Sequence, residues 1–245
     1  MKKVALVTGG LGGLGTAMCK ALSQSGHLVV TTYSGNEEKK ANWQAKMKVE
    51  GFEFALYKCD VADYESCAEA IAGIKQEVGS IDILVNNAGI TRDGTIKKMT
   101  KDAWDAVIDT DLNSLFNMTK HVLDDMIEKN WGRIINISSI NGQKGQFGQA
   151  NYAAAKAGVH GFTMAVAQEV AKKGITVNTI APGYVATDMV MSVPDEVRDK
   201  IVACIPIGRL GRPDEIAALV NYLASDISGF MTGAELAING GHHMM

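Results

Sequence analysis

The sequence has few cysteines and no metal-binding or redox motif. Its only cysteines are Cys19, Cys59, Cys67 and Cys204. They show neither CxxC spacing nor a histidine at metal-ligand intervals. We therefore expect reduced thiols packed in a core, without disulfides and without a bound metal. The adjacent His242 and His243 have no carboxylate near them in the sequence, which argues against a zinc site there.

A strong net charge and a long hydrophobic run are also missing. The formal net charge is −3, and charges of both signs are interspersed without a basic or acidic tail. We therefore expect no nucleic-acid partner. No stretch approaches the ~18 apolar residues of a membrane span. The apolar run that follows Met1-Lys2-Lys3 is too short for a signal peptide. The expected protein is soluble and cytoplasmic, and it has no membrane partner.

Short apolar runs alternate with longer helical patterns along the whole chain. Most of the runs are continuously apolar and β-branched, which is typical of strands buried on both faces. The expected strands are Lys3–Thr8, His27–Thr32, Glu53–Lys58, Ile81–Asn86, Gly132–Ser138, Thr176–Ala181 and Glu235–Ile238. The expected helices are Leu14–Ser25, Asn36–Glu50, Asp63–Val78, Lys101–Lys129, Asn151–Lys173 and Pro213–Ser225.

This alternation predicts the fold class. A strand–helix–strand order requires a parallel sheet with right-handed crossovers, so we expect an α/β fold with helices on both faces of about seven doubly wound strands. No internal repeat or low-complexity linker divides the sequence. We therefore expect one domain over residues 1–245.

The first expected strand leads directly into a glycine-rich turn that opens a helix. The turn reads Thr8-Gly9-Gly10-Leu11-Gly12-Gly13-Leu14-Gly15. Glycines permit a tight turn and a close backbone approach to a pyrophosphate, which then faces the helix N-terminus. A glycine turn alone can be merely structural. Between a strand and a helix, however, it predicts dinucleotide binding.

Tyr152 and Lys156 are four residues apart in an expected helix, so they share one of its faces. A positive charge ~4 Å from a phenol stabilises its ionised form by roughly 4 kcal/mol at an effective dielectric of ~20. The pair is weak evidence when taken alone. The chain has six tyrosines, and 24 of its 245 residues are Lys or Arg, so this spacing arises by chance about as often as not.

Three further motifs support a functional role for the Tyr152–Lys156 pair. Asn86-Asn87-Ala88-Gly89 ends the fourth expected strand, Asp60-Val61 follows the third, and Pro182-Gly183 follows the sixth. With Ser139, Tyr152, Lys156 and a glycine turn of the form TGxxxGxG, the chain resembles the short-chain dehydrogenase/reductase family along nearly its whole length. The resemblance implies a Rossmann-type fold. The cofactor-binding residues it implies are Gly9, Gly12, Gly13, Leu14, Gly15, Ser34, Lys39, Asp60, Val61, Asn87, Ala88, Gly89, Tyr152, Lys156, Pro182, Gly183 and Thr187.

The end of the second strand bears on which dinucleotide binds. Enzymes that select NAD usually carry an acid there, but this strand ends at Ser34 without one. Ser34 can donate to a 2′-phosphate, and Lys39 or Lys40 can approach it. Glu37 and Glu38 would repel a phosphate if they faced inward. The alternative is an ordinary solvated helix face. We expect NADPH/NADP+ as the cofactor.

The resemblance also implies carbonyl reduction. Tyr152 would protonate the carbonyl oxygen, Ser139 would donate a hydrogen bond to it, and Lys156 would stabilise the phenolate and bind the nicotinamide ribose. Asp111 stands where the family has a catalytic asparagine, whose main-chain carbonyl holds a water of the proton relay. That carbonyl survives the change, so we expect a working relay. The alternative is that the carboxylate pairs with Lys156 and blunts its effect.

A narrower resemblance concerns the substrate. Residues 136–149, Ile90-Thr91-Arg92-Asp93 and the ending Asn239-Gly240-Gly241 are similar to a bacterial branch of the family. That branch reduces acetoacetyl-CoA to (R)-3-hydroxybutyryl-CoA for polyhydroxybutyrate synthesis. The substrate-binding residues it implies are Asp93, Ser139, Gln146, Phe147, Gln149, Gly183 and Tyr184. Alternatively, Gln146 and Gln149 are only surface loop residues. Residues 187–207 are expected to form a lid over the substrate.

Two other functions stay open at this point. A reductase of 3-oxoacyl groups on acyl carrier protein shares every catalytic motif, but its acidic partner requires a basic patch near the site mouth. Candidates for that patch are Lys129, Arg133, Lys172 and Lys173, and the alternative is that they are helix-end charges with no partner. A nucleotide-sensing regulator without turnover is a third interpretation, and the retained Tyr152 and Lys156 argue against it. The family resemblance also implies a homotetramer built through the two long helices and the last strand.

Overall fold

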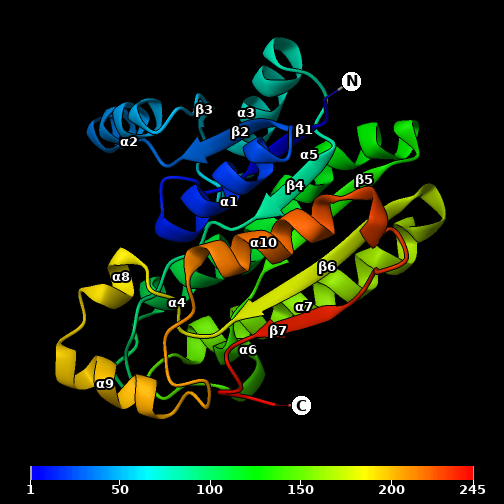
Figure 1. The fold of residues 1–245 in the computed structure, drawn as a ribbon. Helices are drawn as coiled ribbons and strands as arrows, with labels where there is room; N and C mark the ends of the chain where they lie inside the picture. Colours follow the sequence, from blue (N-terminus) through cyan, green and yellow to red (C-terminus); the bar gives the residue numbers. More distant parts are fainter. Residues whose placement is uncertain (1, 245) are drawn as a thin grey trace.

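The computed structural model describes residues 2–244, apart from the side chain of Met189. Its centre is a seven-stranded sheet in the order β3-β2-β1-β4-β5-β6-β7 (Figure 1). All neighbouring strands are parallel. The strands are β1 (Val4–Val7), β2 (Leu28–Tyr33), β3 (Ala55–Lys58), β4 (Ile83–Asn86), β5 (Gly132–Ile137), β6 (Ile175–Pro182) and β7 (Glu235–Ile238). The predicted doubly wound parallel sheet is confirmed.

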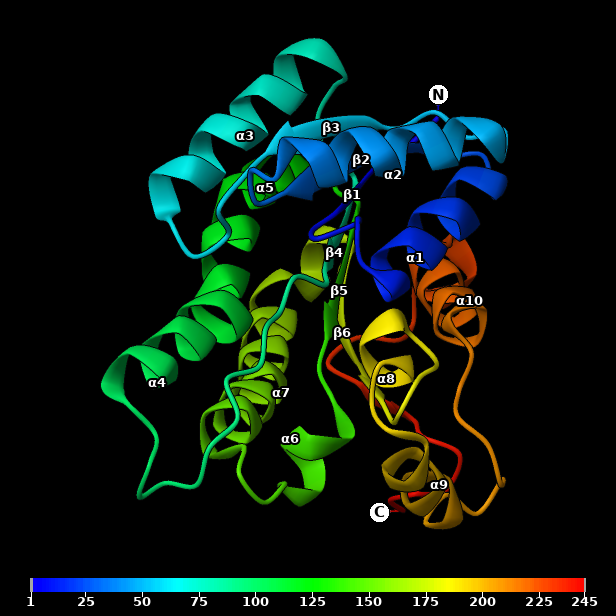
Figure 2. The same cartoon turned by 90° about the vertical axis from the view of Figure 1, so that its left-hand side faces the viewer.

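Helices cover both faces of this sheet. They are α1 (Gly13–Gln24), α2 (Glu37–Val49), α3 (Tyr64–Glu77), α4 (Lys101–Ile108), α5 (Ser114–Lys129), α6 (Ile140–Lys144), α7 (Ala150–Val170), α8 (Asp188–Met191), α9 (Asp195–Ala203) and α10 (Pro213–Ala224). Figure 2 views the sheet nearly on edge, with α4, α5 and α7 on one side and α1 and α10 on the other.

Two apolar cores explain why most strands read as continuous apolar runs. Successive side chains of a strand point to opposite faces. Leu6 and Leu84 therefore pack into the core beneath α3, α5 and α7. Their neighbours Val7 and Val85 pack into the core beneath α1 and α10. All four side chains are fully buried.

The prediction of one continuous helix over Lys101–Lys129 is wrong in one respect. The structure divides it into α4 and α5, joined by a π-helical turn, Asp109–Asn113. Such a turn accommodates one residue more than a regular helical turn and is frequent at functional sites. Here it carries Asp111, whose side chain is buried and turned toward Lys156. The spacing of apolar residues in the sequence gives no sign of this extra residue.

The sequence did not predict the short helix α6 directly after β5, nor the helices α8 and α9. These two lie in the segment 187–207. Within residues 2–244, no helix is long and apolar enough to cross a membrane. The same part of the chain holds no group of three or more His, Cys, Asp and Glu side chains placed to bind a metal.

Candidate active site

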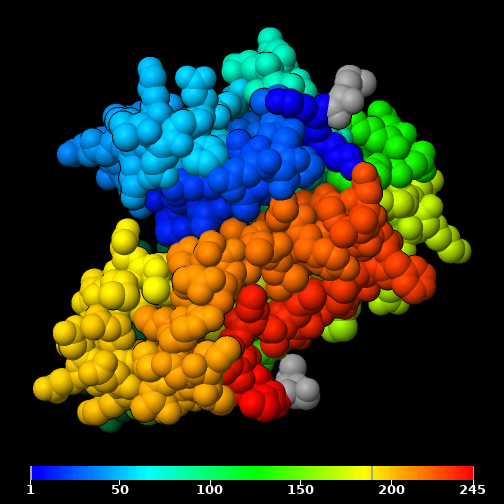
Figure 3. Space-filling model, in the orientation of Figure 1, coloured from blue at the N-terminus to red at the C-terminus, as the bar shows by residue number. Residues whose placement is uncertain are grey.

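A cavity of about 750 Å³ opens at the carboxyl edge of the sheet. This is the edge at which open parallel sheets bind their ligands. Figure 3 shows the surface hollowed between the blue α1–α2 region and the yellow segment around α8. Every residue of the predicted cofactor-binding set, from Gly9 to Thr187, lines the cavity.

The glycine turn closes one end of the cavity. Thr8 Oγ1 accepts hydrogen bonds from the main-chain N–H groups of Asn87 at 2.9 Å and Ala88 at 3.0 Å. Asn87 Nδ2 donates in return to the Thr8 carbonyl at 2.8 Å. These bonds tie the turn to the motif that ends β4. A Cβ at Gly15 would lie 2.6 Å from the Gly9 carbonyl oxygen, so only glycine fits there.

The N-terminus of α1 follows this turn with no side chain capping it. Its first N–H groups therefore remain available to an anion, and the helix dipole favours negative charge at this end. A closely packed glycine cradle beside an uncapped helix start fits the pyrophosphate of a dinucleotide. The residues present thus fit the group that the sequence predicted.

The end of β2 offers a place for a further phosphate. Ser34 and Lys39 both line the cavity. The Glu37 carboxylate accepts a hydrogen bond from the Tyr33 hydroxyl at 2.6 Å and lies 3.2 Å from Lys40 Nζ. Its charge is therefore met by Lys40. The sequence left open whether Glu37 would repel a phosphate. The hydrogen bond from Tyr33 and the ion pair with Lys40 offset that repulsion.

A second hollow of about 610 Å³ adjoins the cavity. It is lined by charged side chains of both signs, which are Glu38, Lys39, Lys46 and Asp188. Glu38 and Asp188 are thus acids that line the hollow beside Lys39, and lysines of α2 line the same hollow.

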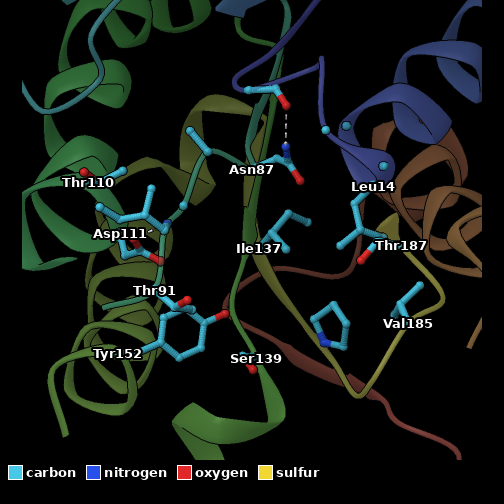
Figure 4. Close-up of a pocket in the computed structure, with 18 of the residues that line it drawn as sticks. Leu14, Asn87, Thr91, Thr110, Asp111, Ile137, Ser139, Tyr152, Val185 and Thr187 are labelled. Carbon is cyan, nitrogen blue, oxygen red and sulfur yellow. Dashed lines mark hydrogen bonds between the residues drawn. The ribbon is translucent and has the colours of Figure 1, made fainter. Parts of the chain in front are cut away.

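Tyr152 and Lys156 lie one turn apart in α7, with Lys156 Nζ 5.6 Å from the centre of the Tyr152 ring. Figure 4 shows Tyr152 and Ser139 on the same side of the cavity, with Leu14 and Thr187 across from them. Ser139 caps α6, because its Oγ accepts a hydrogen bond from the Asn141 N–H at 3.1 Å. The strand end, the capped helix α6 and the first turns of α7 therefore bring the three predicted residues together.

Lys156 and Asp111 form a buried ion pair. Their Nζ and Oδ2 atoms are 3.1 Å apart, and their side chains are 5% and 0% exposed. Asp111 Oδ1 accepts a hydrogen bond from the Ile90 N–H at 2.8 Å, and Lys156 Nζ donates to the Ile137 carbonyl at 3.1 Å. The pairing that the sequence left as an alternative is present in the structure.

Both members of the pair have shifted pKa values. Burial raises the pKa of Asp111 above its ordinary value, and the charge of Lys156 opposes this rise. Burial is the largest single influence on Lys156 and disfavours its ammonium, yet the Asp111 carboxylate and Tyr152 together outweigh burial and hold the pKa of Lys156 above its ordinary value. The lysine therefore stays protonated in this dry environment.

The substrate residues implied by the resemblance are only partly assembled. Ser139, Gln149, Gly183 and Tyr184 line the cavity. Gln149 Nε2 donates to both carboxylate oxygens of Asp93 at 3.0 Å, so Asp93 is held beside the cavity rather than in its wall. Gln146 and Phe147 are outside the lining, and Phe147 is 87% exposed.

Several polar residues that the sequence did not single out support this arrangement. Asn141 Nδ2 donates to Gln149 Oε1 at 2.9 Å. Asn151 Oδ1 accepts from the Tyr152 N–H at 2.8 Å and is fully buried. The His242 ring stacks on Tyr184 with 5.8 Å between ring centres. The only available signal was their position near Ser139, Tyr152 and the end of the sequence.

The basic patch considered for a carrier protein is not at the cavity. Lys129 is the last residue of α5, and its Nζ atom lies 2.6 Å from the carboxylate of Asp82, which directly precedes β4. Arg133 lies at the start of β5, is buried, and donates to the Ser225 carbonyl. Lys172 and Lys173 immediately precede β6. All four therefore lie at the amino edge of the sheet, opposite the cavity, and they form no basic patch at its mouth.

Known proteins are similar to this chain over nearly its full length. The pattern of the family described as short chain dehydrogenase matches residues 3–198. Over 243 residues, 99% of each chain, the protein is 56% identical to the acetoacetyl-CoA reductase of Cupriavidus necator. It is 56% identical over 240 residues, 98% of each chain, to nodulation protein G of Azospirillum brasilense. It is 46% identical over 244 residues, 99% of this chain and 98% of the relative, to the 3-oxoacyl-acyl-carrier-protein reductase of Pseudomonas aeruginosa. As its motifs predicted, the chain belongs to the short-chain dehydrogenase/reductase family.

Proposed function

We propose that the protein reduces acetoacetyl-CoA to (R)-3-hydroxybutyryl-CoA with NADPH and so supplies polyhydroxybutyrate synthesis. The observation that carries this proposal is the meeting of Ser139, Tyr152 and Lys156 in one cavity with the glycine cradle. The substrate is supported by the 56% identity to the acetoacetyl-CoA reductase of Cupriavidus necator.

The cofactor would occupy the cavity from the glycine turn to Tyr152. A bound nicotinamide dinucleotide supplies the hydride for the reduction. The uncapped start of α1 would hold its pyrophosphate, and Asp60 and Val61 would hold its adenine. Ser34 and Lys39 would bind the 2′-phosphate, which favours NADPH over NADH because no acid ends β2.

Tyr152 and Ser139 would act on the substrate carbonyl oxygen. Negative charge develops on that oxygen during reduction, so Ser139 donates a hydrogen bond that strengthens as the charge grows. Tyr152 transfers its hydroxyl proton to the same oxygen as general acid. The phenolate left behind faces Lys156, whose Nζ is 5.6 Å from the ring centre. At an effective dielectric of ~20, such a pair of charges attracts by about 3 kcal/mol.

Asp111 would moderate Lys156 without stopping it. The carboxylate keeps Lys156 protonated, which preserves the charge that stabilises the phenolate. It also shares that charge, so the attraction toward Tyr152 is smaller than with a neutral amide at position 111. The main-chain carbonyl of residue 111 remains to hold a water of the proton relay.

The acyl-CoA would enter beside Gln149 and Tyr184. The Asp93–Gln149–Asn141 bonds fix the Gln149 amide at the cavity wall, and an amide there suits the amide-bearing arm of a thioester. Phe147 would cover the arm from its exposed loop. The segment 187–207 would close over the substrate as a lid, since Val190 of α8 lines the cavity.

Initial rates test the proposal directly. NADPH and NADH oxidation should be measured with acetoacetyl-CoA, with longer 3-oxoacyl-CoAs and with acetoacetyl groups on acyl carrier protein. We expect NADPH with acetoacetyl-CoA to give the highest kcat/KM. A rate about tenfold higher on the carrier protein, a difference of ~1.4 kcal/mol in transition-state stabilisation, would make the carrier-protein reductase the better assignment. NADPH binding without oxidation by any 3-oxoacyl thioester would instead support a regulator.

We also propose a homotetramer built through α5, α7 and β7. Phe116 on α5 is 54% exposed, and Met164 on α7 is 51% exposed. Phe116 stacks with Tyr64 at 6.1 Å between ring centres, which forms an apolar surface for a second copy. Light scattering coupled to gel filtration measures the assembly state, and a monomer at micromolar concentration would contradict the proposal.

A further inference from the structure

Two cysteines outside the proposed catalytic residues lie together at one end of the cavity. Cys59 directly follows β3, and Cys67 lies in the first turn of α3. Their Sγ atoms are 3.8 Å apart. Both side chains are buried, but Cys59 lines the cavity whereas Cys67 lies behind it. A small molecule in the cavity can therefore reach Cys59 first.

The pair brackets the segment proposed to hold the adenine. Cys67 Sγ contacts the carbonyl oxygens of Asp60 at 3.7 Å and Val61 at 3.6 Å. The same segment is tied to α3 by Ser66 Oγ, which accepts from the Asp60 N–H at 3.0 Å. A movement of either sulfur is therefore transmitted to Asp60 and Val61.

The thiol of Cys59 has a lower pKa than the thiol of Cys67. Contact with the Cys67 thiol lowers the pKa of Cys59, and the same contact raises the pKa of Cys67. The thiol that ionises first is thus the one that faces the cavity. A thiolate, rather than a thiol, is the nucleophile in thiol–disulfide exchange.

We propose that Cys59 and Cys67 form a redox-active thiol pair that reacts with small-molecule disulfides entering the cavity. The Cys59 thiolate attacks one sulfur of the disulfide, forms a mixed disulfide and releases the other half as a thiolate. Cys67 then loses its proton, attacks the Cys59 sulfur and displaces the second half. The protein gains one disulfide and loses two hydrogen atoms, and the small disulfide is reduced to two thiols.

Oxidation should weaken nucleotide binding, a consequence that rests on the proposed cofactor site. A disulfide bond is about 2.05 Å long, so the sulfurs must approach from 3.8 Å by nearly 2 Å. That approach pulls on Asp60 and Val61 through Cys67. The mixed disulfide also places its attached group in the cavity beside these residues.

Thiol chemistry tests the pair without any cofactor. The full-length protein carrying Cys204→Ser, which removes the exposed thiol, is treated with dithionitrobenzoate under native conditions. We expect two released thiols per chain, an intact mass lower by two hydrogen atoms, and a Cys59–Cys67 cross-link in the peptide map. Dithiothreitol should cleave the cross-link and restore the original mass. Thiols that react only after unfolding would overturn the proposal.

Two variants separate the roles of the cysteines. In the same background, Cys67→Ser should stop at the mixed disulfide, with one thiol released and the aromatic group retained on residue 59. Cys59→Ser should leave Cys67 unreacted, because Cys67 does not line the cavity. If Cys67 reacts as fast without Cys59 as with it, the proposed order of attack is wrong.

Experiments with NADPH test whether the Cys59–Cys67 pair affects the proposed cofactor site. With NADPH at ten times its dissociation constant, modification of Cys59 should slow about tenfold, because only the free protein reacts. The oxidised protein should bind NADPH about tenfold more weakly by fluorescence titration, a change of ~1.4 kcal/mol. An intact cross-link with unchanged NADPH affinity would overturn the effect on binding. Absence of NADPH binding to the reduced protein would instead refute the cofactor assignment and leave the thiol result standing.

Discussion

The Lys156 ammonium and the Asp111 carboxylate lie 3.1 Å apart, and both side chains are buried in the wall of the cavity. Neither charge is stable alone at such depth, since each loses its hydration. Each therefore depends on the other for its ionised state. The lysine that faces Tyr152 is consequently one half of a pair, and its effect on the tyrosine depends on the protonation of Asp111.

Asp111→Asn tests this dependence through pH. Burial raises the pKa of Asp111, so the carboxylate takes up a proton at a higher pH than an exposed aspartate does. Above the pKa of Asp111 the carboxylate helps to keep Lys156 protonated, and below it the acid pH itself favours the protonated amine. As the pH falls through the pKa of Asp111, Lys156 loses its counter-charge and the wild-type kcat should approach that of Asp111→Asn. Above that pKa, the ratio of the two kcat values should be constant.

The measurement is kcat for both proteins across the acid range, with melting temperatures as a check on folding. At neutral pH we expect the two kcat values to agree within about tenfold, or ~1.4 kcal/mol, because the main-chain carbonyl of residue 111 is kept. A larger gain in turnover for Asp111→Asn would mean that the carboxylate obstructs the relay.

Tyr152→Phe removes the proposed proton donor while keeping the ring. Loss of a general acid typically costs 10²–10⁴-fold in rate, so we expect kcat to fall by roughly that factor. NADPH affinity should change little, because the ring and Lys156 remain. Stopped-flow or steady-state NADPH oxidation measures the first effect, and fluorescence titration measures the second. Turnover within about threefold of wild type would remove Tyr152 from the mechanism.

Lys39→Ala tests the choice of cofactor. A hydrogen bond to a charged group contributes about 1.5–3 kcal/mol, so KM for NADPH should rise about ten- to a hundredfold. KM for NADH, which has no 2′-phosphate, should stay the same. Lys48→Ala is the matched control, because Lys48 lies on the same helix but lines neither hollow. Equal effects on NADPH and NADH would place the 2′-phosphate elsewhere.

Glu215→Gln tests a stability contribution at the start of α10. Glu215 accepts hydrogen bonds from the Arg209 guanidinium at 2.7 Å and from the Arg212 N–H at 2.8 Å. The Arg209 bond is the main reason that its pKa falls to about 2. A depressed carboxyl pKa stabilises the folded state fully above its unfolded value near 4.3, and this contribution disappears as the pH falls to about 2. The variant should melt lower at pH 7, and the difference should shrink below about pH 4.

Melting curves of both proteins over that pH range provide the comparison. Asp214→Asn is the control, since the neighbouring carboxylate contacts only the exposed Arg212 side chain. A melting difference that stays constant down to about pH 3 would assign the effect of Glu215→Gln to packing rather than to charge.

The sequence was sufficient to predict the sheet and the glycine-rich turn at its carboxyl edge. Largely apolar strands such as β1 and β4 and the glycine turn have local causes, namely burial on both faces and the φ freedom of Gly9. The positions of Ser139, Tyr152 and Lys156 follow because each is next to a predicted strand end or helix start. Local patterns of this kind are visible in one sequence.

The remaining features arise from contacts between distant segments. Asp111, in the π-helical turn, pairs with Lys156 of α7, and Gln149 donates to Asp93. The position of Lys129 and Arg133 away from the cavity has the same origin. Lys129 and Arg133 follow helix and strand patterns correctly, but the edge of the sheet they reach is fixed by the direction of the strands. The contact between Cys59 and Cys67 required the packing of α3 beside β3.

The π-helical turn at Asp109–Asn113 amounts to a single inserted residue that the protein has kept in its longest helical segment. Deleting one residue there would restore a regular hydrogen-bond ladder and improve the helix locally. The deletion would also rotate α4 relative to α5 by about 100°, the angle that one residue occupies in an α-helix. Asp111 would then leave Lys156, and the face of α4 that packs on α7 would turn away. The π-helical turn therefore keeps Asp111 beside Lys156 and α4 packed against α7.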